Sequence, residues 1–284
     1  MAASRSRRVG AAAVLVILLI VAALAIAKFK HVQFPVVGAS GCVVHGGQFP
    51  VTLDTGQASI AATIAGVAAH RSMPVRAVTI AYATALQESK LQDLSYGDRD
   101  SVGVFQQRPS EGWGSRHQLL DPVYASTRFF AALAAVPRYQ HLRIYQAAQA
   151  VQRSADGSAY DQYAPQGAAM AGGFSGHLPH DVWCWYPSGI HGHAKLSAAG
   201  TQLRQTFGWL PISRAGDPVA LARVHGTDTG WAVAAWLVSH ASRFGIKHVS
   251  YQGYEWTAAQ GRKGWTSQPK ARHGPAARFG VAFG

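Results

Sequence analysis

An apolar segment near the N-terminus decides in which compartment the rest of this chain folds. Residues 9–27 carry no charged side chain, and at about 1.5 Å per helical residue they nearly span the roughly 30 Å hydrocarbon core of a bilayer. Three arginines precede the segment and two lysines follow it. This charge pattern predicts a cytoplasmic N-terminus and an extracytoplasmic location for everything after residue 30.

The apolar segment has two possible fates, and both export the remainder of the chain. Residues 25–27 read Ala-Ile-Ala, which is typical of a signal peptidase site, but the apolar core exceeds the roughly 7–15 residues of an ordinary signal peptide. We expect a single-pass anchor in the cytoplasmic membrane over residues 1–30, followed by a spacer over 31–54, with secretion after cleavage as the alternative. No other segment is long and apolar enough to span a bilayer, which excludes a transporter.

The basic balance of the chain does not indicate nucleic acid. The formal net charge is +13, but five basic residues flank the apolar segment and the others are scattered. No run of Lys and Arg is interleaved with aromatic residues as a nucleic-acid groove would require, and an anionic cell-wall partner explains the charge equally well. Because only 14% of residues are charged and 48% are hydrophobic, we expect buried cores rather than a disordered chain.

The two cysteines, Cys42 and Cys184, are far apart in the sequence. An exported chain meets an oxidising compartment in which cysteine pairs persist as disulfides. We therefore predict a Cys42–Cys184 disulfide, with two free buried thiols as the alternative. In the chain-entropy view, closing so long a loop contributes at most roughly 5 kcal/mol.

The central region has the periodicity of a helical domain. Residues 55–73 place apolar side chains at helical intervals. A second helix over residues 74–89 has no charge between Arg76 and Glu88, which is typical of a buried helix. A polar segment without a helical pattern follows over 91–113, and we call it the excursion. Long loops of this kind are usually functional. Further helices are expected from Asp121-Pro122 onward, over 145–153 and over 159–172. We thus expect an all-α domain over 55–184.

The pattern changes in the last third of the chain. Residues 185–220 contain Pro, Gly and Ser clusters and are expected to form a linker. Residues 221–284 alternate short strands with one helix, which predicts a small α+β module. The module contains several tryptophans, which are either platforms for sugar rings or core residues. The tryptophans are Trp231, Trp236, Trp256 and Trp265.

Glu88 is the strongest candidate for a catalytic group. Cleaving a glycosidic bond near neutral pH requires a partly desolvated carboxylic acid that protonates the leaving oxygen. Glu88 is the only acid on a helix of buried character, and it lies in the last turn, directly before the excursion. The alternative is a helix-end glutamate paired with a nearby arginine.

Three short motifs in this region resemble the signature of the soluble lytic transglycosylase family, which belongs to the lysozyme superfamily. The family has a Glu-Ser pair at a helix end, a Gly-Leu-Met-Gln-like turn and an Ala-Tyr-Asn-Ala-Gly-like helix. The corresponding segments are Ala85-Leu86-Gln87-Glu88-Ser89, Gly103-Val104-Phe105-Gln106 and Ala150-Val151-Gln152-Arg153-Ser154. Residues 97–113 also resemble exported wall-associated proteins of actinobacteria. The resemblance spans residues 55–184 and implies a lysozyme-like fold.

The resemblance implies a role for each matching residue. Glu88 would be the general acid and base, Ser89 would orient the sugar or the glutamate, and Gln152 replaces the asparagine that contacts substrate. Val151 stands where the family has a tyrosine, so a tyrosine further along the chain would supply the aromatic contact. The implied substrate-binding residues are Ser89, Gly103, Gln106, Gln107, Gln152, Tyr160 and Tyr163.

The resemblance also implies the reaction, which is cleavage between N-acetylmuramic acid and N-acetylglucosamine. In a transglycosylase, Glu88 protonates the bond while the acetamido group assists, and the product carries a 1,6-anhydro end. A hydrolase instead needs a second carboxylate. Asp98 and Asp100 are the candidates for it, and the alternative is that both are turn residues beside Arg99.

We expect neither a metal ion nor another cofactor. His177 and His180 are three residues apart and His191 and His193 are two apart, but no nearby cysteine or Glu-His motif completes a zinc site. Ala241–Trp256 faintly resembles part of actinobacterial D-Ala-D-Ala carboxypeptidase-like domains, whose closing His-x-His is missing here. We therefore expect the C-terminal module to be a non-catalytic binding or spacing unit.

Two functions follow from these observations. The first is a membrane-tethered murein lytic transglycosylase or lysozyme that acts on peptidoglycan glycan strands. The second is a non-catalytic peptidoglycan-binding or scaffold protein of the cell envelope that keeps the lysozyme-like groove. Retention of Glu88 favours the enzyme, and the altered third motif favours the scaffold.

Overall fold

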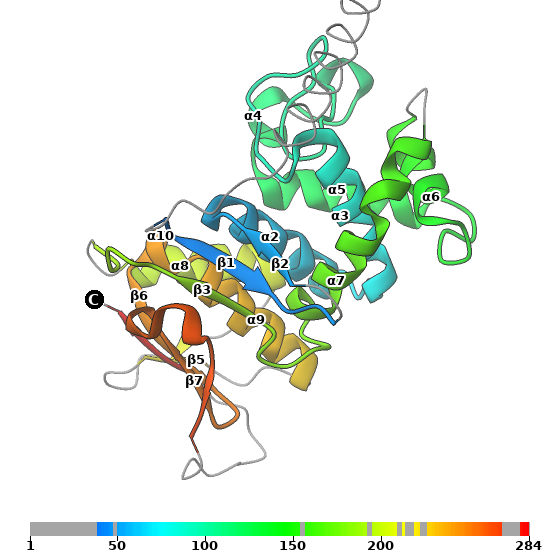
Figure 1. Cartoon of the computed structure of the whole chain (residues 1–284). Coiled ribbons are helices and arrows are strands. Elements are labelled where there is room, and N and C mark those ends of the chain that lie inside the picture. Colours follow the sequence, from blue (N-terminus) through cyan, green and yellow to red (C-terminus); the bar gives the residue numbers. More distant parts are fainter. Residues whose placement is uncertain are drawn as a thin grey trace, which may run out of the picture. The chain divides into compact units, whose positions relative to one another are not determined.

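The computed structural model describes residues 39–47, 50–153, 157–191, 195–208, 212–213, 219–221, 226–268 and 279–283. The predicted membrane segment, residues 9–27, lies outside them. Among the described residues, no helix combines the length and the apolar character needed to cross a membrane. This part of the chain is mainly helical, with two small antiparallel sheets (Figure 1).

The helical segments of the described residues follow the sequence pattern closely in the first half of the chain. Their bounds are α2 (Thr55–His70), α3 (Val75–Ser89), η1 (Pro109–Glu111), α4 (Arg116–Leu119), α5 (Pro122–Ala134), α6 (Ile144–Gln152), η2 (Ser158–Tyr163), α7 (Ala164–Phe174), α8 (Leu196–Phe207), α9 (Thr227–Ser239), α10 (Ala241–Phe244) and η3 (Ala258–Lys263).

Local capping explains where the two central helices begin. Asp54 caps α2, since its Oδ1 accepts from the amide of Gln57 at 2.7 Å while the Gln57 Oε1 accepts from the amide of Asp54 at 3.0 Å. Pro74 precedes α3 in an extended conformation, which its fixed φ favours. Every residue of α3 from Ala77 to Leu86 is buried, which confirms the expectation of a buried helix.

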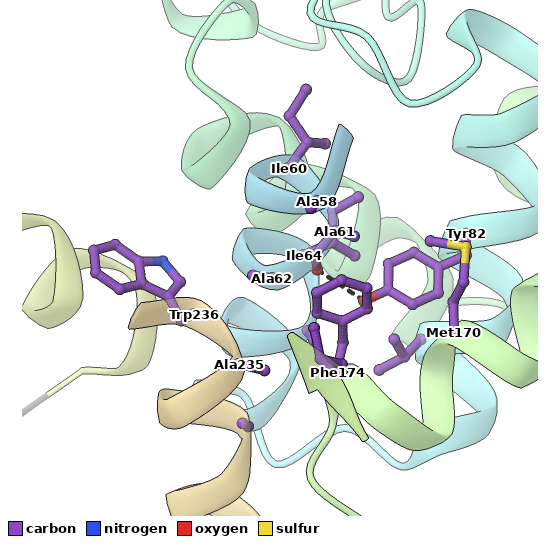
Figure 2. Close-up of a cluster of buried hydrophobic side chains, with 14 of the residues drawn as sticks. Ala58, Ile60, Ala61, Ala62, Ile64, Tyr82, Met170, Phe174, Ala235 and Trp236 are labelled. Carbon is purple, nitrogen blue, oxygen red and sulfur yellow. Dashed lines mark hydrogen bonds between the residues drawn. The ribbon is translucent and has the colours of Figure 1, made fainter. Parts of the chain in front are cut away.

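The core forms where α2, α3, α7 and α9 pack together (Figure 2). Small residues on α2 let its neighbours approach closely, and the tightest approach is at Gly66, where a Cβ atom would come within 2.4 Å of Thr206 on α8. The Tyr82 hydroxyl of α3 donates to the carbonyl oxygen of Ala61 at 2.7 Å, which satisfies the one polar atom of a fully buried ring.

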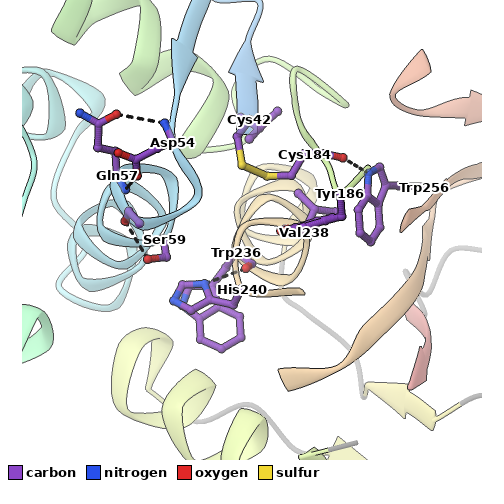
Figure 3. Close-up of a disulfide and its surroundings, with 12 residues drawn as sticks. Cys42, Asp54, Gln57, Ser59, Cys184, Tyr186, Trp236, Val238, His240 and Trp256 are labelled. Atoms are coloured by element: carbon purple, nitrogen blue, oxygen red, sulfur yellow. Dashed lines mark hydrogen bonds between the residues drawn. A yellow bond between two sulfur atoms is a disulfide. The ribbon is translucent and has the colours of Figure 1, made fainter. Parts of the chain in front are cut away.

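The first sheet has the order β2-β1-β3 and contains the disulfide (Figure 3). Cys42 lies directly opposite Cys184 in the antiparallel register, and the two are bonded, so the predicted disulfide is confirmed. The expectation of an all-α region up to residue 184 was wrong at its end, because residues 182–184 pair with β1 through backbone hydrogen bonds. The strands are β1 (Gly41–Val44), β2 (Val51–Leu53) and β3 (Val182–Trp185).

The second sheet lies in the last third of the chain and has the order β4-β5-β9-β6-β7-β8. Indole N–H groups connect it to β3, since Trp256 Nε1 donates to the carbonyl oxygen of Cys184 at 2.9 Å and Trp265 Nε1 to that of Val182 at 2.7 Å. Of the four tryptophans in this region, three are core residues that are at most 3% exposed, namely Trp231, Trp236 and Trp256, and Trp265 is partly buried. The strands are β4 (Ile212–Ser213), β5 (Val219–Leu221), β6 (Ile246–Tyr251), β7 (Tyr254–Thr257), β8 (Thr266–Ser267) and β9 (Phe279–Phe283).

The residues expected to form a linker contain a full helix. Leu203 and Phe207 of α8 are buried, and α8 packs against α2. On the other side of the expected boundary, α9 also packs against α2. By their contacts, residues 40–284 form one compact unit with a continuous hydrophobic core.

Candidate active site

The C-terminal end of α3 presents Glu88 at the edge of the core. The residues of α3 from Ala77 to Leu86 are buried, whereas Gln87 and Glu88 are half-buried. The helix stops at Lys90, whose left-handed φ of 56° turns the chain into the excursion. Because α3 packs against α5, α6, α7 and η2, its last turn opens beside the segments that carry the other motifs.

Two side chains from different elements hold the Glu88 carboxylate. The Tyr160 hydroxyl of η2 donates to Glu88 Oε1 at 2.6 Å, and Gln152 Nε2 of α6 donates to the same oxygen at 3.3 Å. Gln152 also donates to the carbonyl oxygen of Phe105 at 2.7 Å, which joins the third motif to the Gly103-to-Gln106 turn. Within the described part of the chain, Glu88 Oε2 accepts no hydrogen bond from protein.

Ser89 is buried and connects α3 to the excursion. Its hydroxyl oxygen lies 2.7 Å from the carbonyl oxygen of Val104 and 3.1 Å from that of Ala85, and it accepts from the amide of Gln92 at 3.2 Å. At 4% exposed, Ser89 contacts protein on all sides. The structure therefore gives it a role in fixing the turn next to Glu88 rather than in touching sugar.

Gly103 is required by the close passage of another segment. Its φ is 77°, and a Cβ atom there would come within 2.2 Å of the carbonyl oxygen of Leu119. An L-residue would need both a disfavoured backbone conformation and a shift of the facing backbone. Gly103 thus sets the course of the turn that ends at Gln106.

Gln106 and Gln107 have different surroundings. Gln106 is half-buried, and its amide braces the excursion, since Oε1 accepts from Ser101 and Nε2 donates to the carbonyl oxygens of Gly103 and Tyr96. Gln107 is 2% exposed and its Nε2 points at the carbonyl oxygen of Ala125 on α5. Gln107 is therefore a core residue, away from any solvent-filled groove.

Tyr163 lies beside the end of α3 and bonds to a different partner from Tyr160. Lys90 Nζ donates to the Tyr163 hydroxyl at 2.6 Å and lies 4.6 Å from the ring centroid. This cation–π and hydrogen-bond pair holds the residue that follows Ser89. Of the two tyrosines considered from sequence, only Tyr160 donates to Glu88 among the described contacts.

The two candidate second carboxylates are unlike each other. The Asp98 side chain is 93% exposed and lies 3.9 Å from Arg99. Asp100 accepts from the Ser110 amide at 2.8 Å, from the Ser110 hydroxyl and from Arg108 Nε, and these bonds, the amide first, lower the pKa of Asp100 to about 2. Asp100 is therefore ionised, and its hydrogen bonds hold the excursion together at Arg108 and Ser110.

A third acid, Asp93, was not singled out from sequence. Loss of hydration and, secondarily, the negative charge of Asp121 raise the pKa of Asp93 to about 6. Asp93 lines a cavity of about 610 Å³ together with the first residues of α2 and α5, and Glu88 is not among the lining residues. The sequence feature that could have singled out Asp93 is its position in the excursion, five residues after Glu88.

The histidines do not form a metal centre among the described residues, where no group of three or more His, Cys, Asp or Glu side chains could hold an ion. His177 pairs with Asp228 at 3.5 Å, and the His180 ring stacks on Tyr254 with 4.3 Å between centroids. His193 lies outside the described residues.

A comparison with protein-family models finds a match in the last third of the chain. Residues 200–278 match the family model described as VldE, C-terminal domain. The match begins within α8 and leaves α3, α6 and Glu88 outside it. A search of curated proteins finds none that matches the chain.

Proposed function

We propose that this chain is an extracytoplasmic glycosidase of the lysozyme superfamily that cuts peptidoglycan glycan strands with Glu88 as general acid and base. The observation that carries the proposal is the carboxylate of Glu88 at the end of a buried helix, held on one oxygen by Tyr160 and Gln152. The motif resemblance over residues 55–184 supports the same conclusion. The predicted anchor over 9–27 would hold the enzyme at the membrane face of the wall.

Each step of the proposed reaction uses Glu88. The protonated acid donates its proton to the oxygen between N-acetylmuramic acid and N-acetylglucosamine, and the bond from that oxygen to the anomeric carbon breaks. The acetamido oxygen of the muramic residue stabilises the anomeric carbon on its other face. Glu88, now ionised, takes the proton from the C6 hydroxyl, whose oxygen attacks the anomeric carbon and closes the 1,6-anhydro ring.

The surroundings of the other carboxylates favour this outcome over hydrolysis. A hydrolase places a second carboxylate at a fixed distance across the sugar. Asp98 is almost fully exposed and Asp100 is committed to Arg108 and Ser110. Neither offers a positioned base, so the substrate's own acetamido group is the better assisting group.

Tyr160 takes the place of the tyrosine that the family carries in its third motif. Val151 is 3% exposed and belongs to the core, and the hydroxyl arrives instead from η2, at 2.6 Å from Glu88. A hydrogen bond of this kind fixes the orientation of the carboxylate without removing its second oxygen from solvent. The departure from the family sequence is thus compatible with retained activity.

Digestion of purified cell walls by the full-length chain tests the proposal. We expect the wild type to release soluble muropeptides with 1,6-anhydro ends, identified by mass spectrometry, and Glu88→Gln to release none. Asp98→Asn is the matched control and should keep most of the activity, because Asp98 is not positioned. No release by either protein would leave the non-catalytic wall-binding alternative, and equal release by the wild type and Glu88→Gln would rule out Glu88 as the catalytic acid.

A further inference from the structure

A second concave surface lies at the last turn of α6, next to the residue that contacts Glu88. It has a volume of about 530 Å³, and we call it the Trp113 pocket. Val151 and Arg153 line it, whereas Gln152 between them bonds to Glu88. Its other walls are the end of η1 and the second half of α5. The polar and aromatic residues that line it are Glu111, Trp113, Arg128 and Arg153.

The pocket carries positive charge that no carboxylate of the described residues neutralises. Arg153 is exposed and caps α6 with a left-handed φ of 53°, and it makes no ion pair within the described residues. Arg128 donates to the carbonyl oxygens of Trp113 and Gly112 at 3.1 and 3.2 Å and likewise has no acidic partner there. Glu111, the acid in the wall, is paired with Arg108. An anionic ligand therefore finds two guanidinium groups available.

The remaining wall is apolar. On α5 and just beyond it, the lining consists of small side chains that suit methyl groups, and the half-buried Trp113 ring adds a flat surface. A ligand that matches both the apolar wall and the arginines carries methyl groups linked to one or more carboxylates. The apolar lining residues are Ala131, Ala132, Ala135, Val136, Pro137, Ala150 and Val151.

We propose that the Trp113 pocket binds the acidic peptide stem that muramic residues carry through their lactyl group, an inference that rests on the proposed function. Stems of this class begin with alanine and continue with an acidic residue, so they present methyl groups and carboxylates in sequence. Arg153 binds a stem carboxylate while Gln152, the preceding residue, stays on Glu88. The enzyme thereby prefers strands whose peptides are still attached.

A binding experiment in the Glu88→Gln background tests the pocket apart from turnover. The probes are a disaccharide with an alanyl-glutamyl stem that has free carboxylates, and chitotetraose, which has no stem, both titrated by calorimetry. We expect Arg153→Gln to weaken the stem-bearing probe about fivefold, which corresponds to about 1 kcal/mol for one exposed charge pair. Arg153→Lys should retain most of the affinity, and chitotetraose should bind all variants equally.

Matched variants decide between the pocket and a general charge effect. Arg204→Gln removes an exposed arginine of α8 and should leave both probes unaffected. The proposal is overturned if Arg153→Gln binds the stem-bearing probe as tightly as its parent, or loses both probes alike. If the wild type cleaves no glycan while Arg153→Gln still loses only the stem-bearing probe, the catalytic proposal fails and the peptide site stands.

Discussion

At the scale of single residues, Glu88 is set apart by its partners rather than by its helix. A half-buried carboxylate with both donors on one oxygen keeps a fixed direction for the other oxygen. The donors reach it from η2 and α6, which are more than sixty residues further along the chain. Rigid support of this kind is what proton transfer to a positioned oxygen requires.

Tyr160→Phe isolates this support. Removing the hydroxyl leaves the buried ring in place and deletes one charge-assisted hydrogen bond, which is worth roughly 1.5–3 kcal/mol. We expect kcat on cell walls to fall at least about tenfold, while the melting temperature falls by only a few degrees. Tyr163→Phe, whose hydroxyl bonds to Lys90, should keep its activity. If both variants cleave at the wild-type rate, Tyr160 does not position Glu88.

Sequence reasoning singled out Glu88 and its two donors, but it did not show how each of the other neighbouring polar residues is used. Glu88, Gln152 and Tyr160 were all singled out, and the structure brings them together. Ser89 and Gln107 carry the residue types of sugar-binding groups, yet their partners are backbone atoms of the core. Whether a polar side chain faces substrate or the protein interior depends on which distant segment covers it, and the motif does not contain that information.

At the scale of elements, helix α9 ends on an ionisable group that burial keeps neutral. His240 is 2% exposed, stacks on Trp236 at 3.9 Å between centroids, and its Nδ1 lies 2.9 Å from the carbonyl oxygen of Trp236. Burial lowers the pKa of His240 to about 3. The junction of α9 and α10 therefore packs around a histidine that the folded chain does not protonate (Figure 3).

This burial predicts an acid-sensitive fold. Below the ordinary histidine pKa of about 6.5, His240 binds a proton in the unfolded chain but not in the folded chain. The stabilisation that neutral, buried His240 gives the folded chain is therefore fully present above pH 6.5 and is progressively lost as the pH falls toward 3. The free energy of unfolding should fall by at most about 1.4 kcal/mol per pH unit in this window. The free energy of unfolding is measured by urea titration at several pH values between 4 and 7. Its change per pH unit should be smaller for His240→Phe than for the wild type. The variant His117→Gln, at an exposed site, should show the same change per pH unit as the wild type.

Element prediction succeeded where capping and periodicity agreed. Asp121 caps α5 through the amide of Val123 at 2.9 Å, as its Asp-Pro pair indicated. The single helix expected over 159–172 divides into η2 and α7, because Pro165 enters at the first turn of α7. This division matters, since η2 is the segment that delivers Tyr160. The pairing of β1 with β3 joins segments far apart in the sequence, so no local pattern indicates it.

At the scale of the whole molecule, α2 is buried from several sides. It packs against α3, α5 and α7, and also against α8 and α9 from the last third of the chain. Pro, Gly and Ser clusters suggested a linker over 185–220, but the apolar stripe of α8 is what attaches this stretch to the core. Composition indicates loops well and gives little information about the contacts between distant segments.

The disulfide stabilises this arrangement at long range. Cys42 and Cys184 are 142 residues apart in sequence, so reduction frees a long loop of the unfolded chain. We expect the double variant Cys42→Ser, Cys184→Ser to lower the free energy of unfolding by about 3–5 kcal/mol in urea titrations. Adding reductant to the wild type should give the same shift and should leave the double variant unchanged; a variant as stable as the wild type would contradict this.

The close approach at Gly66 has a consequence for how the chain can be shortened. The surface that Thr206 and Phe207 cover there consists of the small side chains of α2, and these would face water if the chain stopped before α8. A fragment ending at residue 195 would keep all of the proposed catalytic groups, but it would expose the apolar surface of α2 that α8 covers. The last third of the chain is therefore needed to cover α2, whatever else it binds.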